Sequence, residues 1–138
     1  MVTSSDYSGT PLAKKIGYKA GFAVMTWHEP LVYFDLLADL PEELDWQEEA
    51  SPGSLDLLHA FYTDKTRLET ELPGLKSKIK KTGMLWLSWP KATSALATAL
   101  KSADVRDAGL AAGLVDVKVC SINQDWSAMK FMYRKKDR

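Results

Sequence analysis

Three groups of polar side chains in this 138-residue sequence follow short apolar segments, and their types fit acid–base chemistry. The groups are His28 and Glu29; Tyr62, Thr63 and Asp64; and Ser88, Trp89 and Lys91. A histidine oriented by a carboxylate is a common general acid–base pair. We therefore take His28 as a candidate base, Asp64 as its orienting group and Lys91 as a candidate anion-binding residue. The competing interpretation is that Asp64 caps a helix and that Glu29 and Lys91 are simply solvated.

These groups can meet only if the segments before them are neighbouring parallel strands, because ligand sites in open α/β sheets lie beyond the carboxyl ends of the strands. Apolar runs at residues 22–27, 55–62 and 84–89 are typical of buried strands. Further strands are predicted at residues 44–47, 115–122 and 128–134. If all three runs lie side by side, the eight polar residues form one ligand-binding rim.

Helical spacing and helix-capping residues separate these strands. Helices are predicted at residues 12–16 and 31–40, from Asp64 to Ile79 with a kink or break at Pro73-Gly74, in part of 91–101, and from a Ser102 cap to Gly113. The first of these is expected to have Thr10 as its cap and Pro11 as its first residue. Gly83 is expected to end the segment that follows Asp64.

Alternating strands and helices indicate a three-layer, Rossmann-like α/β fold with a mostly parallel six-stranded sheet. About four residues join the last two strands, so these strands form an antiparallel hairpin. Only the strand at 128–134 is expected to be antiparallel, and 22–27 and 55–62 are expected to be neighbours. Val24, Leu57 and Leu87 are predicted to lie in the core.

Composition is that of one globular domain, predicted over residues 8–138 after a flexible polar start at residues 1–7: apolar residues make up 46% and charged residues 26%. Cys120 is the single cysteine, so no intrachain disulfide and no cysteine-built metal site is expected. No apolar run approaches about 18 residues. The N-terminus also lacks an apolar signal core, and we expect a cytoplasmic protein without a membrane segment or metal.

Charge is unevenly distributed although the net charge is zero. Residues 20–64 contain ten acids and no Lys or Arg, so the rest of the chain carries 18 bases and eight acids. Two solvated surfaces of opposite sign explain this pattern, and a self-complementary surface or a cationic partner would explain it as well. The acidic half argues against nucleic acid as a partner, despite the basic residues after position 133.

Three phrases in the sequence resemble a family of small bacterial proteins of unknown function. They are YSGTPLAKKIG at residues 7–17, GMLWLSWPK at 83–91 and GLAAGLVDVKVC at 109–120. This resemblance extends from Tyr7 to Arg138 and implies no particular activity.

A second resemblance is to the S-adenosylmethionine-dependent methyltransferase fold. Residues 81–88 resemble its fifth strand after a glycine turn, Ala112-Gly113-Leu114 resembles the approach to its sixth strand, and a terminal hairpin also fits. Only seven residues, 48–54, join two of the predicted strands, which is too short for a helix, a strand and another helix. The resemblance therefore implies that the third strand and its flanking helices are missing. It also implies the strand order 44–47, 22–27, 55–62, 84–89, 128–134, 115–122 across the sheet.

The cofactor turn of that fold is altered here. The resemblance implies glycines just after the first strand, but this sequence has Trp27-His28-Glu29-Pro30 and no G-x-G anywhere. We expect Trp27 to fill the space of the cofactor. Glu48 and Glu49 lie about 20 residues past that strand, where an acid would hold ribose hydroxyls, so they are candidate cofactor-binding residues beside Trp27. No cofactor is expected, and S-adenosylmethionine is the alternative.

Several other residues that could do chemistry are interpreted as packing residues. We expect His59 to be a buried histidine with a hydrogen-bond partner, and Cys120 to be a small buried apolar residue. Trp86, Trp89 and Trp126 are expected to pack in or beside the core.

Three functions remain open from the sequence. One is a non-catalytic module that binds a small molecule or a protein; the second is a methyltransferase or acid–base enzyme with an atypical loop at residues 27–30; the third is a structural subunit. The strand at 44–47 would be a short acidic sheet edge, whose copies repel one another, so we expect a monomer or weak dimer.

Overall fold

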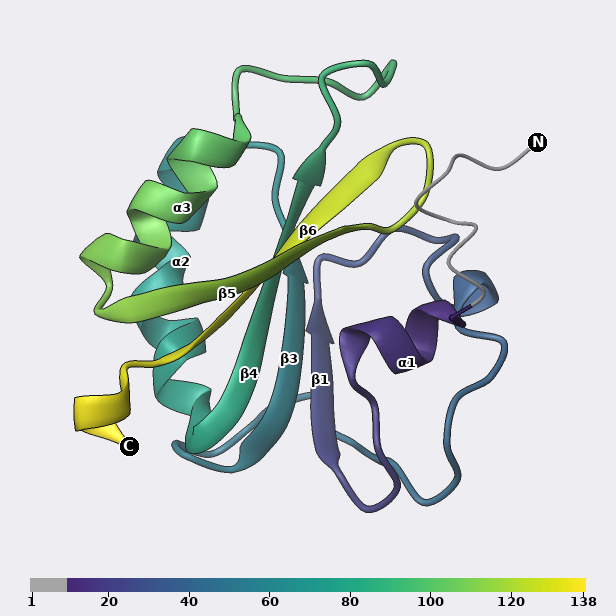
Figure 1. The fold of residues 1–138 in the computed structure, drawn as a ribbon, viewed down its shortest axis with the longest axis vertical. Helices are drawn as coiled ribbons and strands as arrows, with labels where there is room; N and C mark the ends of the chain where they lie inside the picture. Colours follow the sequence, from purple (N-terminus) through teal and green to yellow (C-terminus); the bar gives the residue numbers. More distant parts are fainter. Residues whose placement is uncertain (1–9) are drawn as a thin grey trace.

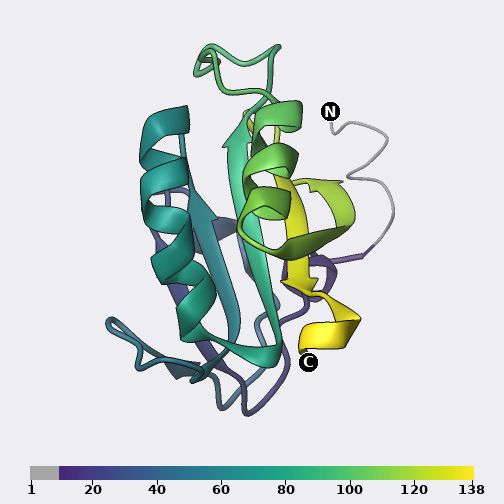
Figure 2. The same ribbon diagram turned by 90° about the vertical axis from the view of Figure 1, so that its left-hand side faces the viewer.

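The computed structural model describes residues 10–138, and in them six strands form one sheet with helices on both faces (Figures 1 and 2). The elements are α1 Leu12–Ile16, β1 Ala23–Trp27, the 3₁₀ helix η2 Phe34–Leu36, β2 Asp45–Trp46, β3 Leu55–Phe61, α2 Lys65–Lys78, β4 Ile79–Pro90, α3 Ser102–Ala111, β5 Leu114–Ser121, β6 Trp126–Tyr133 and the 3₁₀ helix η3 Lys135–Asp137. The predicted flexible start at residues 1–7 lies outside the described residues.

The strand order is β2-β1-β3-β4-β6-β5, as the sequence predicts. β1 lies between β2 and β3 and is parallel to both, and β3 is parallel to β4. β6 is antiparallel to both of its neighbours, β4 and β5. The carboxyl ends of β1, β3 and β4 therefore lie along one edge of the sheet, where the candidate residues follow them.

Each face of the sheet has its own apolar core. On one face the long helices α2 and α3 pack over β3 and β4 and contribute Leu68, Leu72 and Val105 (Figure 2). On the other face α1 and the connection from β1 to β2 contribute Ile16 and Tyr33. Val24, Leu57 and Leu87 are at most 1% exposed, so their predicted place in the core is confirmed.

Helix α2 runs unbroken through Pro73, so the predicted kink or break is wrong. A proline removes the hydrogen bond to the carbonyl four residues earlier, here that of the exposed Glu69, where water can replace it. The helix ends at Lys78, and β4 begins at the next residue. Gly83 therefore lies inside a strand and does not end the helix.

The predicted helix at residues 31–40 is also wrong, because only the 3₁₀ turn η2 forms there. Helical spacing would bury Leu31, Phe34 and Leu37 together. In the structure Leu31 is 100% exposed, and Tyr33 takes a buried position because its hydroxyl bonds to core residues.

Three smaller predictions about helices also need correction. Residues 91–101 form turns without a helix, and Lys101, not Ser102, is the cap of α3, because the Asp104 carboxylate accepts the Lys101 N–H at 2.9 Å. Helix α1 begins at Leu12, and the cap position before it is held by Pro11 and not by Thr10.

A chain of buried hydrogen bonds crosses the sheet beneath α1. The hydroxyls of Tyr18 and Tyr33 lie 2.8 Å apart, Tyr33 Oη lies 2.7 Å from His59 Nδ1, and His59 Nε2 lies 2.6 Å from Ser88 Oγ. The prediction of His59 as a buried, hydrogen-bonded residue is thus confirmed. Trp86 is fully buried and donates to the Ile16 carbonyl at 2.7 Å, which ties α1 to β4.

We predict that His59 makes the protein less stable as the pH falls below 6.5. Burial lowers the pKa of His59 from 6.5 to about 3. The unfolded chain therefore binds a proton that the folded chain does not, so stability falls by about 1.4 kcal/mol per pH unit between these values. Urea unfolding at pH 6.5 and pH 5 in a His28→Gln background, which removes the other histidine, should show a loss of about 2 kcal/mol. A His59→Gln variant with the same loss would contradict this.

We also predict opposite effects of alanine at two helical glycines. A Cβ at Gly109 in α3 would overlap the ring of Phe131, which is fully buried and cannot move away, whereas a Cβ at Gly74 in α2 meets nothing within 4 Å. Gly109→Ala should destabilise the fold by about 1–3 kcal/mol through overpacking. Gly74→Ala should stabilise it by about 0.5–1 kcal/mol through helix propensity. Thermal unfolding of the pair measures both signs, and a stabilising Gly109→Ala would refute the close approach of α3 to β6.

Candidate functional site

The carboxyl ends of β1 and β3 meet the start of α2. The two strands are paired in parallel, with Trp27 opposite Ala60, so their following residues lie side by side. His28 has a left-handed backbone, with φ 58°, which is uncommon for a residue other than glycine. This turn brings the His28 ring edge-on to Tyr62, with 5.5 Å between the ring centroids.

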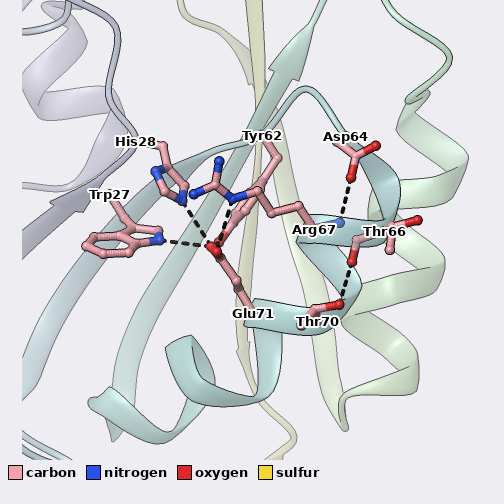
Figure 3. Close-up of polar contacts among 8 residues, drawn as sticks. All are labelled: Trp27, His28, Tyr62, Asp64, Thr66, Arg67, Thr70 and Glu71. Atoms are coloured by element: carbon pink, nitrogen blue, oxygen red, sulfur yellow. Dashed lines mark hydrogen bonds and ion pairs between the residues drawn. The ribbon is translucent and has the colours of Figure 1, made fainter.

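The Glu71 carboxylate on α2 is the centre of the polar contacts at this edge (Figure 3). Its Oε1 accepts hydrogen bonds from Trp27 Nε1 at 2.9 Å, His28 Nε2 at 3.0 Å and Tyr62 Oη at 2.6 Å. Its Oε2 accepts from Arg67 Nε at 3.1 Å. Four donors from three elements of the fold therefore converge on one side chain.

The charges of this cluster follow from its hydrogen bonds. Burial alone would raise the pKa of Glu71, but hydrogen bonds from Tyr62, Trp27, Arg67 and His28 outweigh it and lower this pKa to about 2. Burial and the hydrogen bond to Glu71 raise the pKa of Tyr62 well above its usual value. At neutral pH Glu71 is ionised and accepts only, so His28 Nε2 carries the proton of their shared hydrogen bond.

Two hollows adjoin the cluster. A small one of about 190 Å³ is lined by His28, Phe61, Tyr62, Thr63, Asp64, Arg67 and Trp126. A larger groove of about 530 Å³ runs along α2 and is lined by Met25, Trp27, Glu48, Glu49, Ala50, Thr70, Glu71, Gly74, Leu75 and Lys78. Trp27 and Glu71 line the groove, whereas His28, Tyr62 and Arg67 line the small hollow, so the cluster borders both.

The structure brings together only part of the predicted rim. His28, Tyr62, Thr63 and Asp64 line the same small hollow. Asp64 caps α2 by accepting the Arg67 N–H at 2.8 Å, as its capping interpretation requires. The predicted His28–Asp64 pair is wrong, because the carboxylate that contacts His28 is Glu71.

The candidate residues at the end of β4 and just after it lie away from this rim. Ser88 is buried and contacts His59, while Trp89 is a core residue. Lys91 Nζ donates to Ser121 Oγ at 2.6 Å, towards the β5–β6 hairpin. Glu29 is half-buried and lines neither hollow. The third group of candidate residues therefore supports packing, and Trp86, Trp89 and Trp126 are buried as predicted.

Sequence reasoning missed Glu71 and Arg67. The available signal was their spacing: counted from the Asp64 cap, Arg67 and Glu71 lie at i+3 and i+7, on one helical face directed at the rim.

Cys120 is half-buried rather than fully buried, and burial raises the pKa of its thiol.

Among residues 10–138, no three His, Cys, Asp or Glu side chains come together in a way that could hold a metal ion. No helix in the same residues has the length and apolar character needed to cross a membrane.

Comparison with solved structures defines the class of fold. A SAM-dependent methyltransferase from Aquifex aeolicus matches with a TM-score of 0.60 and 15% identity, over 88% of this chain and 87% of that chain. The magnesium protoporphyrin IX methyltransferase of Synechocystis PCC 6803 with bound SAM matches with a TM-score of 0.54 and 13% identity, over 83% and 71%. This chain therefore has a methyltransferase-like α/β fold.

A possible exported protein from Bordetella parapertussis also matches, with a TM-score of 0.60 and 12% identity over 84% of this chain, but the match spans only 63% of that protein. No curated protein matches the sequence. Residues 39–135 match DUF3052, a family described as proteins of unknown function, and the chain belongs to this family. The resemblance to a family of unknown function is thus confirmed.

The turn after β1 differs from the glycine turn that the resemblance to methyltransferases implies. Their glycines let the backbone approach the cofactor, whereas Trp27 here is held at the turn by Glu71, and His28 follows it in a left-handed conformation. Glu48 and Glu49 do line the groove beside Trp27. The candidate ribose-binding acids and Trp27 therefore adjoin one groove.

We predict that Glu71 stabilises the fold through this cluster. Glu71→Ala leaves the Tyr62 hydroxyl and the Trp27 indole without their acceptor, so the free energy of unfolding should fall by about 1–2 kcal/mol. The matched control is Glu69→Ala, an exposed carboxylate two residues earlier, which should change stability by less than about 0.5 kcal/mol. Urea unfolding measures both variants, and equal effects would show that the cluster contributes nothing specific.

Proposed function

We propose that this chain is a non-catalytic binding or interaction module on a shortened methyltransferase-like fold. The observation that carries the proposal is the position of Trp27, whose indole donates to Glu71 at the turn where the fold class places its cofactor. Contacts between the backbone and the cofactor need small residues at this turn, because only these let the backbone come close. A bulky side chain held there by a hydrogen bond blocks that approach.

The neighbouring charges support the same proposal. The Glu71 carboxylate already accepts four hydrogen bonds, so it has little capacity left for a ligand. His28 donates one of them from Nε2, so only its Nδ1 could accept a proton. Both groups take part in the contacts that hold the closed turn.

A second candidate is a methyltransferase with an atypical cofactor loop at residues 27–30. The observation in its favour is the groove of about 530 Å³ in which Trp27, Glu48 and Glu49 meet. A nucleoside there would place its ribose near the two carboxylates. This candidate and the first differ in one measurable property, the affinity for the cofactor.

Calorimetric titration with S-adenosylmethionine and S-adenosylhomocysteine tests the proposal. We expect no saturable heat, and hence a Kd weaker than about 1 mM. In Trp27→Gly the turn is opened, and any gain in affinity should appear there and not in Leu31→Ala, which truncates a fully exposed apolar side chain nearby. Saturable binding to the unmodified protein tighter than about 1 mM would favour the methyltransferase candidate.

A further inference from the structure

Two exposed aromatic side chains lie at the edge strand β2. Phe34 is 46% and Trp46 42% exposed, and their rings pack edge-to-face with centroids 5.5 Å apart. The buried Tyr18 lies beneath, 5.9 Å from Trp46 between ring centroids. We call Phe34 and Trp46 the aromatic edge. Because the rings are ordered by each other and still accessible, they offer a preformed apolar contact surface.

Among the described residues, the main chain of β2 pairs with β1 on one side and with no strand on the other. The N–H groups of Asp45 and Gln47 both donate to β1, to Phe22 O and Val24 O at 2.8 Å. Hydrogen-bonding groups alternate in direction along a strand, so the N–H and C=O of Trp46 point away from β1. β2 is the end of the sheet in the described residues, and these groups therefore face outward.

The surroundings of the aromatic edge are acidic. Asp35, Asp39, Glu42, Glu43 and Asp45 are all exposed. None of the ion pairs among residues 10–138 includes any of them. The whole segment 20–64 has no Lys or Arg. A second copy of this edge would be repelled, whereas a cationic segment would be attracted.

We propose that an extended, basic segment of another protein binds as an added strand along β2. Its main chain pairs with Trp46, its apolar side chains pack on the aromatic edge, and its Lys or Arg side chains lie beside the acids. Strand addition of this kind draws affinity from the main chain and specificity from alternate side chains. The segment occupies the position of the third strand that this shortened sheet lacks. This inference deepens the proposed function and rests on its binding role.

Paired synthetic peptides test the proposal. The probe is a capped 12-residue peptide of alternating Val and Lys, and its control has Glu in place of each Lys. By NMR, the Lys peptide should shift Phe34 and residues 44–48 and slow the hydrogen exchange of the Trp46 N–H. The Glu peptide should not bind, and raising the salt from about 50 to 200 mM should weaken the Lys peptide several-fold. Failure of the Lys peptide to bind, or equal binding of both peptides, overturns the proposal.

Two variants at one position separate strand addition from simple apolar contact. Trp46→Thr removes the indole and keeps the outward N–H, and Trp46→Pro removes both. Proline leaves the two bonds to β1 intact, because these bonds use Asp45 and Gln47. We expect Trp46→Thr to weaken the Lys peptide several-fold and Trp46→Pro to weaken it by at least about tenfold more. Equal loss in the two variants would overturn strand addition.

A charge-reversed variant keeps the test decisive if the proline variant does not fold. Asp35→Lys combined with Asp39→Lys leaves β2 unchanged and should shift preference from the Lys peptide towards the Glu peptide.

Light scattering on the unmodified protein tests whether a second copy of this chain binds at β2 instead. A tight, salt-insensitive dimer joined through residues 44–47 would contradict the proposal. Titration with S-adenosylmethionine tests the turn at Trp27, whereas the peptide experiments test β2. Failure of the proposed function can therefore be distinguished from failure of strand addition.

Discussion

The carboxylate of Glu71 connects the three elements that form the candidate site. Trp27 and His28 come from the end of β1, Tyr62 from the end of β3, and Glu71 from the second turn of α2. Without an acceptor at this position, an indole, a hydroxyl and a guanidinium would compete for water in a partly buried corner. The hydrogen bonds that hold Trp27 and His28 at this turn both end on this one ionised group.

The shortness of the connection between β2 and β3 is the second constraint. Only residues 47–54 join these strands, so within residues 10–138 the sheet ends at β2, and no described helix lies beside α2 over β1. One consequence is the groove along α2, lined by Met25 and by Glu48, Glu49 and Ala50. The other is the outward-facing main chain of Trp46.

The two faces of the sheet differ in whether they bury polar side chains. The face under α2 and α3 is apolar, whereas the face under α1 holds the hydrogen-bonded chain from Tyr18 to Ser88. In the described residues no buried side-chain polar atom lacks a partner. A fully satisfied polar chain makes one arrangement of α1 and of the segment around Tyr33 much more favourable than its alternatives. The hydrogen bonds of Tyr33 therefore decide the conformation of residues 31–40, and the helical spacing of their apolar residues does not.

Local sequence patterns were sufficient for the strands and most of the helices. Apolar runs, the Asp64 cap and the glycine after Ile16 act over a few residues, and the order of the strands followed from the resemblance to the methyltransferase fold together with chirality rules. Patterns failed at residues 31–40 and at Pro73, because tertiary bonds of Tyr33 and the leucines of α2 outweigh local preference. Trp27, His28, Tyr62 and Asp64 were identified from their places after strands. Their partner Glu71 was not, because it lies 43 residues from His28 and only the packing of α2 across β1 and β3 brings the two together.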